Sequence, residues 1–316
     1  MSSKRALVTG GAGFIGSHVV DALLDAGFGV TVVDNLSSGR RTNLPAAAGL
    51  RVADVRDRAL REVFQAEKPD VVFHLAAQVS VGASVASPVE DAETNIIGLV
   101  NVVEAAIRAG ARRVVFSSSA AVYGEPETLP LTETAVTRPE SPYGLSKLTG
   151  ERYLELLGRR HGLEYVILRY ANVYGPRQSA EGEAGVIAIF ASGLAQGRPV
   201  AIFGDGRQTR DFIFVRDVAA ATVLAGISPD AVGRVINVSS GVRADILSVY
   251  RVIAELSGGP TNPVFGPDRP GDVRDSLLDN SRARAFLGWT PEIALNAGLR
   301  ETVEFLQRTP WDTGNA

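Results

Sequence analysis

The sequence predicts an α/β protein that combines a doubly wound parallel sheet with a smaller C-terminal α/β lobe. Two observations predict it. Short apolar runs of strand length alternate with helix-period segments in the first half of the chain, and a glycine cluster lies between the first run and the first helical segment. Strands that alternate with helices form right-handed βαβ units around a parallel sheet that is covered on both faces.

The expected elements follow one another in strict alternation. Strands are expected at 6–8, 30–33, 71–75, 114–116 and 165–168, and helices at 15–26, 58–67, 91–109 and 142–160. Gly27, Gly110 and Gly162 each follow a helical segment, where a residue that adopts the left-handed C-cap conformation is favoured.

A second lobe is expected where the composition changes. From about Tyr174 glycine and proline become denser, and longer irregular segments separate the helical pieces. We therefore expect one domain over residues 1–175 and a second lobe over 176–316, with residues 217–240 returning to the first domain.

The composition excludes several classes of protein. A formal charge of −3 gives no bulk attraction to nucleic acid or to an anionic membrane. The absence of cysteine excludes disulfides, cysteine-ligated metals and thiol nucleophiles, and three widely spaced histidines argue against a metal site. Residues 1–9 lack an apolar signal core, and no run approaches the roughly 18 apolar residues of a membrane span, so a cytoplasmic protein is expected.

The glycine cluster directly follows a strand and opens a helix. It fits two registers, Gly10-x-x-Gly13-x-x-Gly16 and Gly11-x-Gly13-x-x-Gly16. Either one permits a tight turn, close approach of the backbone to a pyrophosphate, and close packing of helix on strand. The pyrophosphate would lie at the helix N-terminus, where free N–H groups favour anions. A glycine turn without a ligand is the alternative.

An acidic residue lies where the second strand ends. Asp34 is placed to accept a hydrogen bond from the 2′-hydroxyl of an adenosine ribose, and its charge would repel a 2′-phosphate. NAD is therefore favoured over NADP, although Arg40 and Arg41 lie nearby. A simple strand-end turn is the alternative for Asp34, and Asp54-Val55 either contacts the adenine or forms a solvated turn.

A resemblance to a known family becomes specific when several motifs are read together in order. The chain resembles the extended short-chain dehydrogenase/reductase family, and within it the NAD-dependent UDP-sugar 4-epimerase branch. The likeness runs from about residue 4 to 308, with second-lobe pieces at 170–177, 204–206, 209–212 and 269–272. The motifs that carry it in the first domain are Thr9–Gly16, Asp34, His74-Leu-Ala-Ala-Gln78, Asn95, Ser117–Gly124 and Tyr143-Gly-Leu-Ser-Lys147.

This resemblance implies a Rossmann domain that binds NAD. The cofactor contacts that we expect are Gly10, Gly13, Phe14, Ile15, Gly16, Asp34, Asn35, Ser37, Gly39, Asp54, Val55, Leu75, Ala76, Ala77, Gln78, Asn95, Ser117, Tyr143, Lys147 and Tyr170. For Tyr170 we expect packing beside the nicotinamide, with a plain core aromatic as the alternative.

Tyr143 and Lys147 lie four residues apart at the start of an expected helix, so both side chains share one face. A free tyrosine has a pKa of about 10, and a neighbouring ammonium together with an oxidised nicotinamide favours its phenolate. The resemblance implies that Tyr143 is the acid and base, that Lys147 also holds the nicotinamide ribose, and that Ser119 hydrogen-bonds the reacting sugar oxygen. An exposed Tyr–Lys pair and a strand-end serine are the alternative.

The two residues after Ser119 bear on the type of reaction. Nucleotide-sugar 4,6-dehydratases place an Asp-Glu pair just before the Val-Tyr-Gly element, whereas this chain has Ala120-Ala121. Since neither alanine can move a proton, we expect oxidation and re-reduction at C4, which inverts that carbon of a UDP-hexose through a 4-keto sugar. A 4,6-dehydratase and a non-catalytic NAD-binding regulator are the alternatives.

The second lobe is expected to hold the UDP-sugar. Arg210 and Arg269 match the diphosphate-binding arginines of the family, Asp272 a carboxylate on the uridine ribose, and Asn172 an amide on the diphosphate-sugar. A surface salt bridge or a helix cap is the alternative for each. The expected substrate contacts are Ser119, Tyr143, Asn172, Arg177, Val186, Arg210, Arg269 and Asp272.

The sugar itself stays open among the glucose, N-acetylglucosamine and glucuronate series. Ser276 takes the place where some family members carry a bulky tyrosine, so a large substituent is not excluded. Arg177 either pairs with a C6 carboxylate, as in UDP-glucuronate, or with an acidic neighbour such as Glu181 or Glu183.

A homodimer is also implied by the resemblance. The family pairs the two helices expected at 91–109 and 142–160 across a four-helix interface, to which Leu154 and Leu157 would add apolar contacts.

Overall fold

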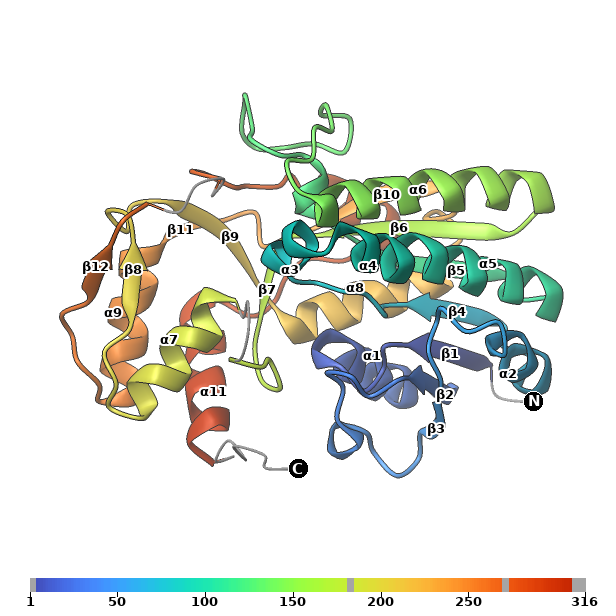
Figure 1. Ribbon diagram of the computed structural model, residues 1–316, viewed down its shortest axis with the longest axis horizontal. Coiled ribbons are helices and arrows are strands. Elements are labelled where there is room, and N and C mark those ends of the chain that lie inside the picture. The colour runs from blue at the N-terminus through green and yellow to red at the C-terminus, as the bar shows by residue number, and fades with distance from the viewer. Residues whose placement is uncertain (1–3, 181–184, 269–272, 309–316) are drawn as a thin grey trace.

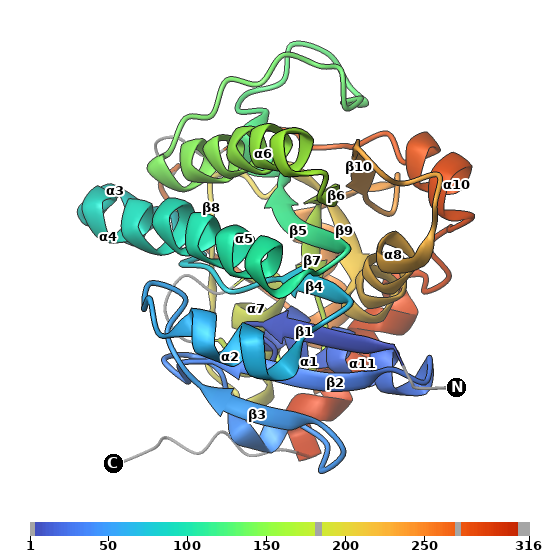
Figure 2. The same cartoon turned by 90° about the vertical axis from the view of Figure 1, so that its right-hand side faces the viewer.

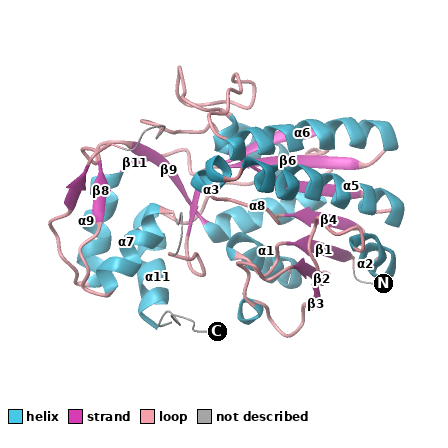
Figure 3. Cartoon of the chain, in the orientation of Figure 1, coloured by secondary structure: helices cyan, strands magenta, loops and turns pink. Residues whose placement is uncertain are grey.

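The computed structural model describes residues 4–180, 185–268 and 273–308 (Figure 1). It has a large lobe built around one parallel sheet and a smaller lobe beside it, in which short strands lie among loops and three helices (Figures 1 and 3). Arg269 and Asp272, which the sequence assigns to the substrate, lie outside the described residues, as do Glu181 and Glu183.

The central sheet of the large lobe has seven parallel strands in the order β10-β6-β5-β4-β1-β2-β3. Their bounds are β1 Arg5–Thr9, β2 Gly29–Asp34, β3 Gly49–Val52, β4 Val71–His74, β5 Arg113–Ser119, β6 Glu164–Tyr170 and β10 Arg234–Val238. From β1 the chain first builds outward through β2 and β3, and then crosses to β4 and continues the other way. The change of direction lies between β1 and β4, and ligands of such sheets bind at the carboxyl ends of the strands at this point. The predicted fold class is confirmed.

Helices cover both faces of this sheet (Figure 2). One face carries α2 (Leu60–Glu67), α5 (Gly98–Ala109) and α6 (Pro142–His161), and the other carries α1 (Phe14–Asp25), α8 (Val215–Ile227) and α10 (Ser281–Leu287). Successive side chains of β1 point to opposite faces of the sheet. Leu7 therefore packs with α2 and α5, while Ala6 and Val8 pack with α1 and α8.

A late part of the chain returns to the large lobe. Strand β10 pairs in parallel with β6 at the edge of the sheet, from Arg234 beside Val166 to Val238 beside Tyr170. Helix α8 packs against α1, and α10 joins the same layer through Ala283 and Leu287. The second lobe is therefore discontinuous in the sequence.

The smaller lobe is assembled from short strands and three helices. One sheet has the order β11-β9-β7, formed by Arg243–Asp245, Thr209–Phe214 and Asn172–Tyr174, and β8 (Ala201–Phe203) pairs with β12 (Val264–Gly266). Helices α7 (Val186–Ala195), α9 (Ile246–Ser257) and α11 (Leu295–Arg308) enclose a core in which Phe190, Tyr250 and Leu299 are fully buried.

The single helix expected at 91–109 is divided in the structure. Two short helices, α3 (Val81–Ala86) and α4 (Pro88–Ala92), lead into a π-helical turn, η2 (Glu93–Ile97), before α5 begins. Pro88 starts α4 at its first turn, where the missing N–H is not needed. Single π-helical turns inside α-helices are frequent at functional sites. Two 3₁₀ turns complete the structure, η1 (Arg41–Asn43) and η3 (Ala120–Val122).

Two absences hold for the part of the chain that is described. Within it, none of the helices is long and apolar enough to cross a membrane. The same residues contain no cluster of three or more His, Asp or Glu side chains suited to a metal ion.

Candidate active site

The glycine loop joins β1 to α1 in a conformation that larger residues cannot adopt. Gly10 has a φ of +70°, and a Cβ on it would lie 2.6 Å from the amide nitrogen of Ala76. A Cβ on Gly16 would lie only 2.1 Å from the carbonyl oxygen of Gly10, and one on Gly11 would meet the Val32 side chain at 2.8 Å. Gly13 is the N-cap of α1 and supplies no side-chain cap. The first turn of α1, with Phe14 and Ile15, thus begins at a bare backbone loop suited to an anion.

Asp34 connects this loop to the turn that follows β2. One carboxylate oxygen accepts from the amide of Ala12 at 2.9 Å, and the other accepts from the amide of Leu36 at 2.9 Å. The side chain is buried, and a Cβ on Gly39 would lie 2.8 Å from it. Asp34 is therefore held at the end of the glycine loop, where the sequence places the ribose of the cofactor.

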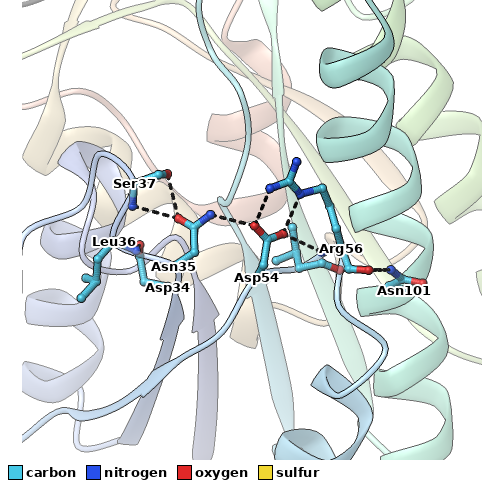
Figure 4. Close-up of polar contacts among 8 residues, drawn as sticks. Asp34, Asn35, Leu36, Ser37, Asp54, Arg56 and Asn101 are labelled. Carbon is cyan, nitrogen blue, oxygen red and sulfur yellow. Dashed lines mark hydrogen bonds and ion pairs between the residues drawn. The ribbon is translucent and has the colours of Figure 1, made fainter.

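A polar network extends from Asp34 to the adjacent strand end (Figure 4). Asn35 accepts from the backbone and hydroxyl of Ser37, and its amide donates to Asp54 at 2.9 Å. The Arg56 guanidinium donates to both oxygens of Asp54, at 2.9 and 2.8 Å, and this holds the pKa of that carboxyl well below its usual range. Asn101 of α5 donates to the carbonyl of Arg56 at 3.1 Å. The carboxylate of Asp54 stays ionised, and its hydrogen bonds with Arg56 and Asn35 fix its orientation.

The segment after β4 lies next to the glycine loop. Leu75 donates from its backbone to the carbonyl of Thr9 at 3.0 Å, and Ala76 and Ala77 continue toward Gln78. Asn95 of η2 holds Gln78 by two bonds of 2.9 Å, one to its amide and one to its carbonyl. Asn95 is buried and also donates to Ser146 of α6 at 3.1 Å, so it ties this segment to α6. Its direct contact with the cofactor stays a prediction.

Ser119, Tyr143 and Lys147 meet at the carboxyl end of β5. Ser119 is the last residue of that strand, and its hydroxyl lies close enough to the phenol of Tyr143 to act on the pKa of that phenol. Lys147, one helical turn after Tyr143, is buried, and its Nζ donates to the carbonyl of Ser117 at 2.9 Å. The same Nζ lies 5.8 Å from the centre of the Tyr143 ring. Ser141 caps the helix by accepting from Gly144 at 3.1 Å, which fixes the first turn of α6.

Burial dominates the electrostatics of this trio. It raises the pKa of Tyr143, against the lowering effect of the Ser119 hydroxyl, and it lowers the pKa of Lys147 to about 8. The sequence leads us to expect a phenol whose pKa is lowered by the ammonium, but in the protein alone the net shift of Tyr143 is upward. Further positive charge beside the ring is needed to bring the phenol into the neutral range.

A second polar layer lies beneath the trio. Glu151, one turn after Lys147, forms a fully buried ion pair with Arg169 of β6 at 2.6 Å. Ser118 donates to the same carboxylate at 2.6 Å, and Ser117 donates to the carbonyl of His74 at 3.1 Å. These bonds fix the strand end that carries Ser119.

Tyr170 ends β6 on the other side of this layer. Its ring belongs to the core, and its hydroxyl bonds to that of Thr222 on α8 at 2.8 Å. Burial raises the pKa of this phenol, so it stays neutral. The structure favours the core alternative, and packing beside the nicotinamide stays a prediction.

Arg177 has a partner that the sequence does not indicate. Its guanidinium pairs with Asp21 of α1 at 2.8 Å, whereas Glu181 and Glu183 lie outside the described residues. The reason is the chain direction: Arg177 has a φ of +68° in the turn after Pro176, whose carbonyl is hydrogen-bonded to His18 of the same helix at 3.0 Å. Arg177 therefore links the junction of the lobes to α1.

Three further residues that the sequence assigns to the substrate lie in the smaller lobe. Asn172 is exposed at the start of β7, and Val186 opens α7. Arg210 of β9 donates to the carbonyl of Thr209 at 3.0 Å, and Ser276 is bonded to the same carbonyl through its amide at 3.1 Å. Arg210 and Ser276 therefore both lie at the carbonyl of Thr209, where β9 begins.

A hollow of about 600 Å³ lies in the same lobe. An ion pair between Arg274 and Asp205, at 3.1 Å, borders it, and Phe265 of β12 is half exposed along its wall. Sequence reasoning assigns no role to any of these three residues, although Asp205 lies in the 204–206 piece of the family likeness. A usable signal is the position of Asp205 and Phe265 in the segments with dense glycine and proline. The lining is Gly204, Asp205, Phe265, Gly266, Pro267, Asp268 and Arg274.

The apolar contacts expected at a dimer interface need a correction. Leu154 is fully buried in the large lobe and cannot add to such an interface, whereas Leu157 is partly buried against the same core and its contact with a second copy stays a prediction. The exposed apolar residues of this helix are Leu145, Tyr153 and Leu156. Leu154 turns inward because it lies seven residues after the buried Lys147, on the same side of the helix.

Comparisons with known proteins identify the family of this chain. A family model described as the NAD dependent epimerase/dehydratase family matches residues 6–239. The chain is 47% identical to a UDP-glucose 4-epimerase of Mycolicibacterium smegmatis over 96% of its length and 98% of that protein. A crystal structure of UDP-glucose 4-epimerase with UDP-glucose from Thermotoga maritima shares 45% identity, with a TM-score of 0.93 over 96% of this chain and 99% of that one. The Thermus thermophilus UDP-glucose 4-epimerase complex with NAD is 42% identical, with a TM-score of 0.90 and coverage of 96% and 99%. This chain belongs to the NAD-dependent epimerase/dehydratase family.

Proposed function

We propose that this chain is an NAD-dependent UDP-glucose 4-epimerase, which interconverts the two C4 configurations of a UDP-hexose. The observation that carries the proposal is the meeting of Ser119, Tyr143 and Lys147 at the carboxyl edge of the sheet, beside the glycine loop. Relatives that share 42–47% identity over nearly the whole chain are named for this reaction, one of them putatively.

The residues of the large lobe fit NAD from one end to the other. A Cβ on Gly10 or on Gly16 would clash with the loop. Because glycine has no Cβ, the backbone before the first turn of α1 can take up this tight conformation and stays open to a pyrophosphate. Asp34 suits a ribose with free hydroxyls and disfavours a 2′-phosphate, and Asp54 is an ionised acceptor for the adenine amino group. When bound, NAD supplies the redox chemistry, since it accepts a hydride from C4 of the sugar and later returns it.

The protein moves one proton in each direction. Tyr143 takes the proton from the sugar 4-hydroxyl and gives it back when the 4-keto sugar is reduced on its opposite face. Ser119, beside Tyr143, orients the same sugar oxygen. The buried ammonium of Lys147 stabilises the phenolate and holds the nicotinamide ribose. Ala120 and Ala121 supply no acid or base for the loss of water, so the reaction ends with inversion.

The smaller lobe supports binding of the UDP group. Arg210 and Arg269 are placed in our proposal on the diphosphate, with Asn172, Val186 and Asp272 on the sugar and uridine. The hollow beside Phe265 and Arg274 is of a size suited to a nucleoside, with one aromatic wall and one cation. Because Arg177 is already paired with Asp21, it gives no support to a C6 carboxylate, and UDP-glucose is favoured over UDP-glucuronate.

The homodimer is part of the proposal. Leu145, Tyr153 and Leu156 share one face of α6, and Ile97 is exposed on the neighbouring η2. Such apolar surface on adjacent helices suits a four-helix contact with a second copy. We expect Leu156→Glu to convert a dimer into a monomer, as measured by light scattering coupled to size-exclusion chromatography. We also expect the protein to act in the cytoplasm, as its sequence indicates.

One experiment tests the activity and the substrate together. The protein is incubated separately with UDP-glucose, UDP-N-acetylglucosamine and UDP-glucuronate, and proton NMR reads the configuration at C4. We expect inversion of UDP-glucose, while turnover of only another sugar would correct the substrate. A 4-keto-6-deoxy product would instead overturn the reaction class.

Variants of two tyrosines test the site. Tyr143→Phe is expected to lower turnover by at least about 100-fold while NAD stays bound, since general acid–base catalysis contributes this much. Tyr165→Phe, on β6 away from the trio, is the matched control and should retain activity. Near-normal turnover of Tyr143→Phe would refute the assignment.

A further inference from the structure

A buried carboxylate lies beside the catalytic helix and has no part in the proposed mechanism. Asp91 of α4 is only 2% exposed, and α4 and η2 pack against the first half of α6 (Figure 1). Its Oδ1 accepts from the side-chain amides of Gln78 and Asn95, at 2.9 and 3.0 Å. Both donors are neutral. A buried ionised group that is bonded to neutral amides is costly unless an opposite charge lies nearby.

The hydrogen bonds of Asp91 lead to the first turn of α6. Asn95, which accepts from and donates to the backbone of Gln78, also donates to the hydroxyl of Ser146 at 3.1 Å. Ser146 in turn donates to the carbonyl of Tyr143 at 2.9 Å, and it is the residue before Lys147. Two side chains, those of Asn95 and Ser146, therefore connect Asp91 with the backbone that carries the acid–base tyrosine.

The opposite charge in this part of the molecule is the ammonium of Lys147. It is buried as well, and its Nζ donates to a neutral acceptor, the carbonyl of Ser117. Burial lowers the pKa of Lys147 to about 8, and the negative charge of Asp91 acts against that decrease. The same charge adds to the effect of burial in raising the pKa of Tyr143.

The other titratable groups around Lys147 do not replace Asp91. His74 on β4 has a pKa lowered to about 3 by burial and by Lys147, so it is neutral. Glu151 of α6 is neutralised in its ion pair with Arg169 of β6. Tyr143, whose ring centre lies 5.8 Å from the Nζ, carries charge only as the phenolate.

We propose that Asp91 is a positioning residue for the reaction, whose buried negative charge balances the ammonium of Lys147 and whose hydrogen bonds fix the turn that carries Tyr143. The inference rests on the proposed roles of Tyr143 and Lys147. It explains why a π-helical turn stands at this point, because η2 places Asn95 between Asp91, Gln78 and Ser146.

The variant Asp91→Asn separates the charge from the hydrogen bonds. An asparagine keeps a carbonyl oxygen that can accept from both amides, and it loses only the charge. Without that charge the pKa of Lys147 and that of Tyr143 both fall. Both limbs of the pH profile of kcat/KM should therefore move to lower pH by about one unit, the effect of a single charge at short range in a protein interior. Glu90→Gln, an exposed carboxylate on the same helix, is the matched control and should leave the profile unchanged.

A second measurement does not depend on turnover. Tyrosinate absorbance is titrated in the protein without substrate, and the signal of Tyr143 is obtained by subtracting that of Tyr143→Phe in each background. The titration of Tyr143 should move to lower pH in Asp91→Asn. If Asp91→Asn does not fold, Asp91→Ser, which is smaller and also uncharged, is read by the same titration.

The outcomes separate this inference from the proposed function. Unshifted pH limbs and an unshifted tyrosinate titration in a folded Asp91→Asn protein would overturn the role of Asp91. If the Asp91→Asn protein loses activity and its lower thermal stability accounts for the whole loss, Asp91 has a purely structural role and the inference also fails. Near-normal turnover of Tyr143→Phe would refute the assignment of Tyr143 itself, whatever the behaviour of Asp91→Asn.

Discussion

Gly16→Ala tests the glycine loop at the position where the geometry leaves the least room. The added Cβ would lie 2.1 Å from the carbonyl oxygen of Gly10, 2.8 Å from its carbonyl carbon and 2.9 Å from the Cα of Gly11. All three atoms belong to the backbone, and real contacts of this kind stay above 3.0 Å, so α1 and the loop must separate by about 0.9 Å. A displacement of about 1 Å in a binding loop is sufficient to lower function about 100-fold. Overpacking of this kind also lowers the free energy of unfolding by about 1–3 kcal/mol.

Two assays measure these effects. Isothermal titration of cofactor-stripped protein gives the NAD affinity, which we expect to fall by about 100-fold, and urea denaturation gives the stability. Gly49→Ala is the matched control, because the atoms nearest to its added Cβ lie at an ordinary contact distance of 3.8 Å. A Gly16→Ala protein that binds NAD as tightly as Gly49→Ala would refute the account of the loop.

Three further predictions concern charged groups. Glu151→Ala leaves the Arg169 guanidinium buried without its partner, so it should lower the free energy of unfolding in urea by about 3–5 kcal/mol; a loss below about 1 kcal/mol would contradict a buried pair. Arg56→Met removes the two bonds that orient Asp54 and should weaken NAD binding about tenfold in calorimetry, whereas an unchanged affinity would show that Asp54 needs no such support. Lys147→Met removes a buried ammonium whose pKa is lowered from 10.5 to about 8. Because the unfolded chain holds this proton more tightly than the folded protein does, the variant should gain about 3 kcal/mol in the free energy of unfolding at neutral pH. It should lose activity at the same time. That gain should shrink as the pH rises from 8 to 10.5, and denaturation series at both ends of this window check it.

The elements that the sequence predicts best are those with a local signal at each end. Helix α6 is expected at 142–160 and is found at Pro142–His161, because Ser141 caps it, Pro142 fits its first turn and Gly162 ends it with a φ of +68°. The strand expected at 114–116 is shorter than β5 of the structure, because no local signal marks where this strand ends. It continues through Ser117–Ser119, and the hydroxyls of Ser117 and Ser118 find partners only in the folded chain, His74 and Glu151.

The features that the sequence does not predict depend on distant contacts. Arg177 pairs with Asp21, 156 residues away, because the turn after Pro176 directs it toward α1. The π-helical turn at Glu93–Ile97 has no signal in the apolar pattern, since its side-chain bonds reach Gln78 and Ser146 on other elements. The orientation of Leu154, in contrast, is contained in the sequence, because Lys147, Glu151 and Leu154 follow one another at helical spacing and all three are buried.

The geometry around Ser119 explains why the chemistry is limited to inversion. Ala121 donates to the hydroxyl of Ser119 at 3.1 Å, and its carbonyl lies so close to α6 that a Cβ on Gly144 would be 2.6 Å away. The segment after β5 is therefore closed against the helix that carries Tyr143, with alanine at both positions where a dehydratase needs an acid and a base. In the proposed mechanism, Tyr143 is then the group that both removes and returns the proton. A single acid–base residue with a redox cofactor that is restored in each cycle gives no net oxidation and no loss of water, so the change that such a site can leave in its product is the configuration of one carbon.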